Sequence, residues 1–265
     1  MFNYIRAEFY KLVRRKYTYI ALGFFLLLEG LLVACYAFHN AHSNPTPFGG
    51  AIPIVVEMGA VGFCICLLTA DIVFAGQYKN STLKNEVSFG LSRTRIYLGK
   101  LIAQTLLSIL YLVAMMGFFL GACAIVLPID PPLAPDEPLY YTLAENALII
   151  VGWFLAAGLP LWIAGQAAAC TCQFLINGDM AASFVYVGIV FVLEPILQIA
   201  GALTGGRVGD VLFKICAYLP GPLLDSAKST VGDWSYMGQT WIVGLFWLAV
   251  CTAVGLYGFN RKEIK

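Results

Sequence analysis

The sequence predicts an all-α, polytopic membrane protein with six transmembrane helices and both termini in the cytoplasm. Of its 265 residues, 60% are hydrophobic and 12% are charged, and the mean hydropathy is +0.80. A soluble domain carries about a quarter charged residues, so this chain has too little polar surface to stay dissolved in water. Its apolar residues fall into six long runs, and its basic residues gather in the connections on one side of those runs.

Residues 1–17 are predicted to form an amphipathic helix in the membrane interface. Apolar side chains recur there at steps of three and four residues, at Phe2, Ile5, Phe9, Leu12 and Val13. Arg6 flanks this stripe, and the remaining charged residues lie mostly on the other side, at Glu8, Lys11, Arg14 and Arg15. Such a helix turns its apolar face to the acyl chains and its basic face to anionic headgroups. Two roles remain open for it, a topology anchor that acts only during insertion and a mechanical part of the protein.

Six runs satisfy the requirement of about 20 mostly apolar residues for a helix that crosses a bilayer. They cover residues 18–38, 52–75, 96–127, 143–169, 181–200 and 239–259. The third and fourth runs are longer than one crossing needs, so we expect these helices to tilt or to extend beyond the membrane.

The basic residues set the orientation of the spans. Thirteen of the 16 Lys and Arg residues lie before the first span, in the loop after the second span and the first turns of the third, or after the last span. They are Arg6, Lys11, Arg14, Arg15, Lys16, Lys79, Lys84, Arg93, Arg95, Lys100, Arg261, Lys262 and Lys265. Because connections rich in Lys and Arg stay in the cytoplasm, both termini are predicted to be cytoplasmic. An even number of spans is then required, and six meets this requirement.

The connections on the other side have the composition of solvent-facing turns. Residues 39–51 contain no Lys or Arg, and residues 127–143 contain five prolines together with Asp130, Asp136 and Glu137. The longest connection, residues 201–238, mixes short apolar pieces with Pro220-Gly221-Pro222. We predict that it forms short helices that lie on the outer leaflet or re-enter it. No internal repeat is evident, so residues 1–265 are interpreted as one membrane domain.

The cytoplasmic loop at residues 76–95 has the pattern of a folded helical hairpin. Asn80, Ser81 or Thr82 suits the N-cap of a short helix, and Gly90 suits its C-terminal end. Ser92 is then placed to cap the next helix, which continues into the third span. A flexible connector would not need these capping residues, so we predict that a soluble partner binds the folded loop.

Two motifs in the chain resemble a known family. The loop motif runs from Tyr78-Lys79-Asn80-Ser81-Thr82-Leu83-Lys84-Asn85-Glu86 through Ser88, Gly90, Ser92-Arg93 and Ile96-Tyr97 to Lys100. The N-terminal motif is Arg6-Ala7-Glu8-Phe9-Tyr10-Lys11-Leu12 followed by Arg14-Arg15-Lys16. Together with the six spans and the long last outer loop, they resemble the type 2 ABC exporter permeases. The most similar subgroup is the one associated with bacitracin and lantibiotic resistance or immunity.

The resemblance implies a permease of the bacterial plasma membrane that pairs with itself and with two copies of a separate ATPase. It would export an antimicrobial peptide, an antibiotic or a related amphipathic compound. The segment seated in the ATPase would be the coupling helix, at Asn80, Ser81, Thr82, Leu83, Lys84, Asn85, Glu86 and Val87. The sequence contains no G-x-x-x-x-G-K-[ST] phosphate-binding loop. ATP and Mg²⁺ are therefore expected in the partner ATPase, with no cofactor bound by this chain.

Two carboxylates inside the spans are candidates for the translocation pathway. Glu29 lies near the middle of the first span, and Glu194 lies in the outer half of the fifth span beside Pro195. A carboxylate at mid-membrane costs about 2.5–3.5 kcal/mol, so such residues usually face a cavity or a partner. Both could attract a cationic substrate. The alternative is that they bond to neighbouring polar groups and only fix the packing of the helices.

Other features carry weaker signals. The pairs Cys64-x-Cys66 and Cys170-x-Cys172 lack the two-residue spacing of zinc or redox sites, so they are interpreted as small apolar core residues. His39 and His42 have no third ligand nearby in the sequence and are interpreted as solvated. No metal site is predicted, and a net charge of +1 gives no indication of nucleic acid.

Two other function classes remain as alternatives. An ion-coupled secondary transporter would usually show an internal repeat with paired broken helices. An intramembrane enzyme would place paired catalytic groups at membrane depth, but the sequence has only two histidines and neither H-E-x-x-H nor G-x-S-x-G. An enzymatic function is therefore not predicted.

Overall fold

A computed structural model describes residues 1–42, 47–51, 54–55, 59, 61–75, 82–128, 144–176, 178–227 and 230–262. The regular elements of these residues are helices, which confirms the predicted all-α class. In chain order they are α1 (Phe2–Val13), α2 (Lys16–His42), α3 (Phe48–Ala51), α5 (Val61–Phe74), α6 (Thr82–Ser88), α7 (Arg93–Val126), α8 (Ala144–Leu175), α9 (Asp179–Val187), the π-helical turn Gly188–Val192, α10 (Leu193–Thr204), α11 (Gly206–Ala217), α12 (Pro220–Ser226) and α13 (Trp234–Arg261).

Five helical segments are long and apolar enough to cross a membrane. They are Lys16–His42, Arg93–Val126, Ile149–Leu175, Met180–Thr204 and Trp234–Arg261. The second predicted span, residues 52–75, corresponds in part to α5, which has 14 residues. At a rise of 1.5 Å per residue, α5 is about 21 Å long, less than the ~30 Å hydrocarbon core of a bilayer. Part of the segment that precedes α5 lies outside the described residues.

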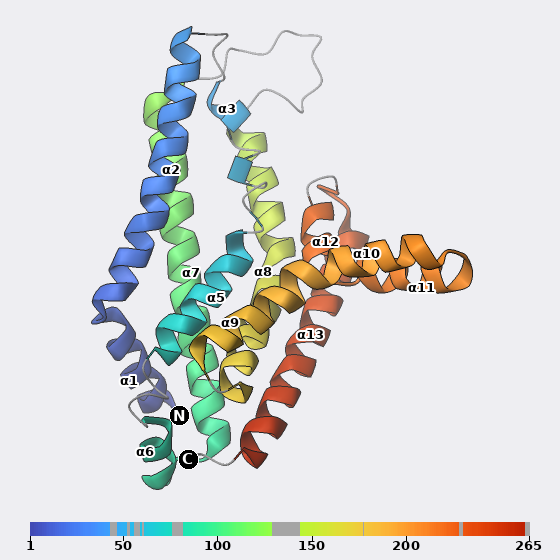
Figure 1. Cartoon of the computed structure of the whole chain (residues 1–265). Helices are drawn as coiled ribbons and strands as arrows, with labels where there is room; N and C mark the ends of the chain where they lie inside the picture. The colour runs from blue at the N-terminus through green and yellow to red at the C-terminus, as the bar shows by residue number, and fades with distance from the viewer. Residues whose placement is uncertain are drawn as a thin grey trace.

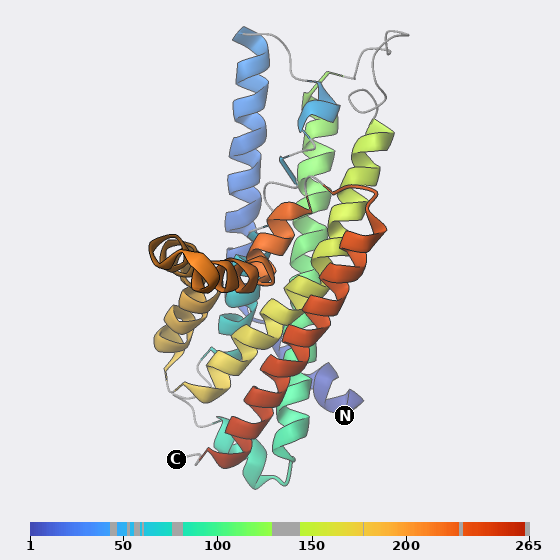
Figure 2. The same cartoon turned by 90° about the vertical axis from the view of Figure 1, so that its right-hand side faces the viewer.

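The long helices lie side by side in a bundle, and the shorter helices lie at its ends and along its side (Figures 1 and 2). We use the name termini end for the end of the bundle that holds α1, α6 and the last turn of α13. At this end α7 begins, and α8 and α13 finish. The pair α10–α11 forms a hairpin that projects sideways from the bundle between its two ends.

The helical segment Met180–Thr204 bends between α9 and α10, where the hairpin begins. Pro195 has no backbone N–H, and its ring would clash with the carbonyl of Phe191 in a regular α-helix. The five residues Gly188–Val192 form a π-helical turn at this place, which provides room for the proline. The predicted span at residues 181–200 is therefore an oblique, bent helix rather than a straight crossing.

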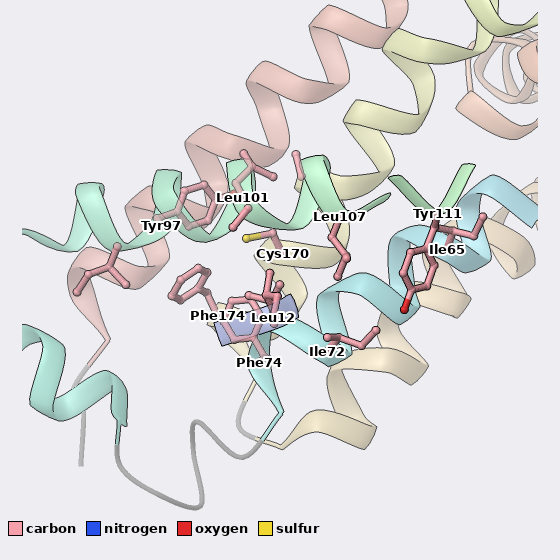
Figure 3. Close-up of a cluster of buried hydrophobic side chains, with 14 of the residues drawn as sticks. Leu12, Ile65, Ile72, Phe74, Tyr97, Leu101, Leu107, Tyr111, Cys170 and Phe174 are labelled. Atoms are coloured by element: carbon pink, nitrogen blue, oxygen red, sulfur yellow. The ribbon is translucent and has the colours of Figure 1, made fainter. Parts of the chain in front are cut away.

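The largest core cluster contains an aromatic group from four helices near the termini end. Phe174 of α8 is its centre, with ring-centroid distances of 4.8 Å to Phe74, 5.1 Å to Tyr97 and 4.4 Å to Phe259. Figure 3 shows Phe74 and Phe174 beside Leu12 of α1. These spacings are typical of favourable aromatic pairs. The cluster holds α5, α7, α8 and α13 together close to the place where α1 and α6 dock.

The residues of α1 that pack against the protein differ from those of the predicted apolar stripe. The helix covers Phe2–Val13 and so confirms an N-terminal helix, but its buried residues are Glu8 and Leu12, whereas Phe2 and Val13 are exposed. The face that docks follows Tyr4, Glu8 and Leu12, at steps of four residues. Glu8 is buried because two lysines contact its carboxylate, a partnership that the pattern of apolar residues could not reveal.

Candidate coupling site

The loop between α5 and α7 folds into the short helix that the sequence predicts. Helix α6 covers Thr82–Ser88 and is followed by Gly90, whose φ of +84° belongs to the left-handed region that glycine favours. Ser92 is the N-cap of α7, and its hydroxyl accepts a hydrogen bond from the backbone N–H of Arg95 at 3.4 Å. The predicted C-terminal stop and cap are thus confirmed. Asn80 and Ser81 lie outside the described residues.

Helix α6 has an inner and an outer face. On the inner face, Leu83 is buried in the main core cluster with Leu12 of α1 and Phe74 of α5. Glu86 and Val87 are half-buried on the same side. Thr82, Lys84 and Asn85 form the exposed outer face, and Phe89, just after the helix, is 87% exposed. Among the predicted coupling residues that the structure describes, Thr82, Lys84 and Asn85 are the ones open to a partner.

A cluster of four charged side chains fixes the inner face of α6 to α1 and α7. The ammonium nitrogen of Lys100 lies 3.2 Å from Glu8 Oε2 and 3.6 Å from Glu86 Oε1. Lys11 lies 2.6 Å from Glu8 Oε1 and 3.8 Å from Glu86 Oε1. Tyr4 donates a hydrogen bond from its hydroxyl to Glu86 Oε2 at 2.9 Å. We call these four charged residues and Tyr4 the charge cluster.

The charge cluster is neutral overall but deeply desolvated at its centre. Lys100 is 0% exposed and Glu8 is 2% exposed. The Lys100 ammonium also lies 5.9 Å from the centre of the Phe74 ring, within the range of a cation–π interaction. A buried charge of this kind is tolerated only where partners surround it, as they do here.

The electrostatics of α1 follow from the same contacts. Burial alone would raise the pKa of Glu8, but the charges of Lys100 and Lys11 and their hydrogen bonds together lower it below its usual value. Burial raises the pKa of Tyr4, and the neighbouring Glu8 and Glu86 raise it further. Glu8 therefore stays ionised and Tyr4 stays a hydrogen-bond donor around neutral pH.

Three basic residues at the termini end bind the C-terminal carbonyls of other helices. Arg93 donates from Nη1 to the backbone oxygens of Phe259 at 2.6 Å and Asn260 at 2.8 Å, in the last turn of α13. Lys262 donates to Phe174 O at 2.8 Å, at the end of α8, and Arg15 donates to Ile72 O, near the end of α5. A helix C-terminus carries unpaired carbonyls and partial negative charge, so each contact is favourable. By sequence all three were interpreted as topology-setting charges, and Arg15 and Arg93 also as members of the two family motifs, but these contacts with helix ends were not predicted.

Glu29 lies in an apolar cavity between α2, α5, α7 and α8. It is 5% exposed, and its Oε2 has no hydrogen-bond partner among the residues that the structure describes. The cavity has a volume of about 40 Å³, and Met115, Phe119, Phe154 and Trp162 contribute to its lining. A volume of this size holds water molecules but not a peptide or an antibiotic.

Glu194 lies in different surroundings. It occupies the first turn of α10 and is half-buried, and Gln198 donates to its Oε1 at 3.1 Å. Its Oε2 faces α12, where a Cβ added to Gly221 would lie 3.3 Å away. Glu194 does not line the cavity that contains Glu29, so the structure does not bring the two predicted pathway residues together.

Two polar clusters inside the bundle were not among the predicted site residues. Gln104 of α7 donates to the side-chain oxygen of Gln166 on α8, and Thr69 of α5 donates to the same oxygen at 3.2 Å. Two turns further along α8, Gln173 donates to Asp71 Oδ1 at 2.6 Å, and Ser183 donates to that atom at 2.9 Å. The seven-residue spacing of Gln166 and Gln173 was the available signal, because it puts both amides on one helix face.

The cysteines and histidines have ordinary surroundings where the structure describes them. Cys66, Cys170 and Cys172 are buried, and Cys64 is exposed. His42 lies within hydrogen-bond distance of the Phe38 carbonyl in its own helix, at 2.9 Å. Across the described ranges, no three His, Cys, Asp or Glu side chains are grouped as a metal site would require.

Comparison with known families assigns the chain. The model of the ABC-2 family of transporter proteins matches residues 4–170, more than half of the chain, and this range includes α1, α6 and the whole charge cluster. A search of curated proteins found no match. The several apolar helices long enough to span a bilayer agree with the family, in which the membrane permease generally pairs with an ATP-binding subunit. The chain belongs to the ABC-2 family and is a multi-pass membrane permease of an ABC transporter.

Proposed function

We propose that this permease is the membrane subunit of an ATP-driven exporter in a bacterial plasma membrane. It works as a homodimer with two copies of a separate ATP-binding subunit, which uses ATP and Mg²⁺. Its substrate is an antimicrobial peptide, an antibiotic or a related amphipathic compound, as the resemblance to the resistance and immunity permeases suggests. Helix α6 is the coupling helix, and both termini are cytoplasmic.

The observation that carries this proposal is the attachment of α6 to α7 through Lys100. The charge cluster joins α6 and α1 to the first two turns of α7, and α7 continues without a break for 34 residues. At 1.5 Å per residue, α7 is about 51 Å long and reaches across a bilayer. A partner that moves α6 would therefore move a complete membrane helix, because the buried ion pairs prevent α6 from sliding on its own.

The path of the chain supports six crossings. Helix α1 precedes α2 at the termini end, and Arg93 holds the last turn of α13 at the same end. An odd number of crossings would place α1 and the last turn of α13 at opposite ends of the bundle. The short helix α5, with the segment before it, is the candidate for the remaining crossing. Helices α11 and α12 fall within residues 201–238 and would form the outer, partly re-entrant cap of the pathway.

Substitutions on the two faces of α6 test the coupling role separately. The permease is expressed in its own host and purified, and the ATPase activity that co-purifies with it is measured. Just after the outer face, Phe89→Ala should reduce the co-purified activity, because Phe89 is an apolar side chain that is 87% exposed. On the inner face, Glu86→Gln should leave the ATPase bound but reduce export, because the link to Lys100 and Lys11 is weakened.

A control and two contrary outcomes complete this experiment. Phe24→Ala removes an exposed aromatic ring from α2 and should affect neither readout. Co-purification that survives deletion of residues 81–89 would remove α6 from the coupling role. Transport that continues without ATP and stops when an ion gradient is collapsed would favour a secondary transporter.

We also propose that Glu29 and Glu194 face the substrate pathway at successive stages of transport. The unpartnered Oε2 of Glu29 supports this role, since a carboxylate held in an apolar cavity is costly unless another state gives it a partner. Glu29→Gln and Glu194→Gln are compared for substrate resistance in cells with matched expression. Reduced resistance supports the role, and unchanged resistance in both variants excludes it.

A further inference from the structure

Helix α11 of the hairpin and helix α13 line an open groove on the side of the bundle. The groove has a volume of about 440 Å³, within the range of small-ligand sites. One wall comes from α11 and the residue after it, with Val211, Lys214 and Tyr218, and the other comes from α13, with Ile242, Phe246 and Trp247. Most of these side chains are exposed, so the groove is open rather than closed off inside the bundle.

The two walls are held at a fixed separation. Trp247 donates from its indole N–H to the carbonyl oxygen of Tyr218 at 3.1 Å, which ties the end of α11 to α13. Within the hairpin, a Cβ added to Gly209 would lie 2.7 Å from the carbonyl oxygen of Gly201. This close approach makes α10 and α11 one rigid arm, so the groove is a built feature of the fold.

The position of the groove along α13 places it at membrane depth. Helix α13 has 28 residues and is about 42 Å long. Ile242 and Trp247 lie about 12 Å and 20 Å from its first residue, Trp234, by the same rise per residue. The groove thus lies in the half of α13 that is nearer Trp234, on a helix long and apolar enough to cross a bilayer.

Among the described residues that line this groove, Lys214 alone is charged. No carboxylate lies within ion-pair distance of it in the part of the chain that the structure describes, although Asp210 is one turn away. A lysine at membrane depth without a partner costs about 2.5–3.5 kcal/mol, and its long side chain reaches toward the headgroups. Arg207, two turns earlier, lies on the same face of α11, so two cations border an apolar groove.

We infer that the groove binds a phospholipid, with an acyl chain along Val211, Ile242 and Phe246 and the phosphate at Lys214. A phosphate offers the anionic oxygens that an unpaired lysine requires, and the acyl chain matches the apolar walls. The lipid holds the hairpin against α13. This site is independent of the exported substrate and of the ATPase.

Native mass spectrometry of the purified, delipidated permease tests the inference. Dioleoyl phosphatidylglycerol is added, and its binding is compared with that of dioleoylglycerol, which has the same chains but no phosphate. The wild type should retain the phospholipid and bind the diacylglycerol at least about tenfold more weakly. Lys214→Gln should reduce phospholipid binding by a similar factor, whereas Lys214→Arg should preserve it.

Two further variants distinguish loss of the groove itself from a change in nearby charge and from misfolding. Val211→Trp fills the groove and should remove the phospholipid adduct without changing the yield of folded protein, because Val211 is exposed. Asp210→Asn removes a neighbouring charge on the same helix and should leave the adduct in place. Equal phospholipid binding by Lys214→Gln, Val211→Trp and the wild type would overturn the inference. If Lys214→Gln and Val211→Trp lose the homodimer but keep the lipid, the inference is also overturned. A second copy of the chain would then occupy the groove.

Discussion

Gly99 of α7 is covered by the ring of Tyr4 of α1. A Cβ added to Gly99 would lie 2.4 Å from Cδ1 of that ring, closer than real side-chain contacts allow. The same tyrosine donates its hydroxyl hydrogen bond to Glu86 of α6. Gly99 is therefore the surface on which α1 rests while it contacts α6, and a larger residue would separate the three helices beside Lys100.

Replacement of Gly99 by alanine should destabilise the permease, although alanine is the better helix former. Gly23→Ala on α2 is the matched control, because a Cβ there would meet nothing within 4 Å. The control should gain up to about 1 kcal/mol from helix propensity, whereas Gly99→Ala should lose about 1–3 kcal/mol from overpacking. Unfolding in mixed detergent micelles measures both. Equal changes in the free energy of unfolding of the two variants would show that the Tyr4 ring moves aside without loss of stability.

Removal of the Lys100 ammonium should cost more than removal of any exposed lysine. Lys100→Met leaves Glu8 buried beside a single remaining cation, and breaking a buried pair in this way typically costs about 3–5 kcal/mol. Lys84→Met on the exposed face of α6 should change stability by less than about 0.5 kcal/mol. The double variant Glu8→Gln and Lys100→Met should recover part of the loss, since neither charge is then left alone. Strict additivity of the two single changes would contradict a direct interaction.

The docking of α1 should weaken in acid. Glu8 has a lowered pKa in the folded protein, so its contribution to stability is fully present above its unfolded pKa of about 4.3. That contribution is lost as the pH falls through the lower, folded-state pKa. Thermal unfolding in detergent from pH 7 to pH 3.5 should therefore show a larger loss for the wild type than for Glu8→Gln. The variant should be less stable at neutral pH, and parallel pH profiles would exclude Glu8 as the cause.

The sequence predicted the parts of this site that depend on local chemistry. A cap at Ser92, a left-handed glycine at Gly90 and the helix between them follow from the backbone requirements of helix ends, and the structure has all three. Local periodicity also predicted a helix over Phe2–Val13, although the predicted segment, residues 1–17, ran past the end of α1 and into α2. These features need no knowledge of distant residues, so composition and spacing were sufficient.

The charge cluster could not be predicted in the same way. Glu8 and Lys100 are 92 residues apart in the chain, and their contact depends on how α1 docks on α7. By pattern alone Glu8 belonged to the solvated face of an interfacial helix, and Lys100 belonged to a group of topology-setting charges. The sideways course of α10–α11 could not be predicted from the sequence either, because hydropathy gives the length of an apolar run and not its direction in space. A 25-residue segment with a long apolar stretch predicts a crossing whether or not a π-helical turn bends it.

Arg93 should control the order of the last turn of α13. Its Nη1 lies 2.6–2.8 Å from the backbone oxygens of Phe259, Asn260 and Lys262, and its guanidinium carbon lies 5.6 Å from the centre of the Phe259 ring. Hydrogen bonds to a charged donor contribute about 1.5–3 kcal/mol, so Arg93→Gln should speed amide hydrogen exchange in this turn by about tenfold or more. Arg95→Gln is the matched control, since Arg95 is exposed on the same turn of α7. Arg93→Lys should give an intermediate rate, because an ammonium reaches fewer carbonyls than a planar guanidinium. An unchanged exchange rate in Arg93→Gln would mean that packing of Phe259 against Phe174 orders the turn without this cap.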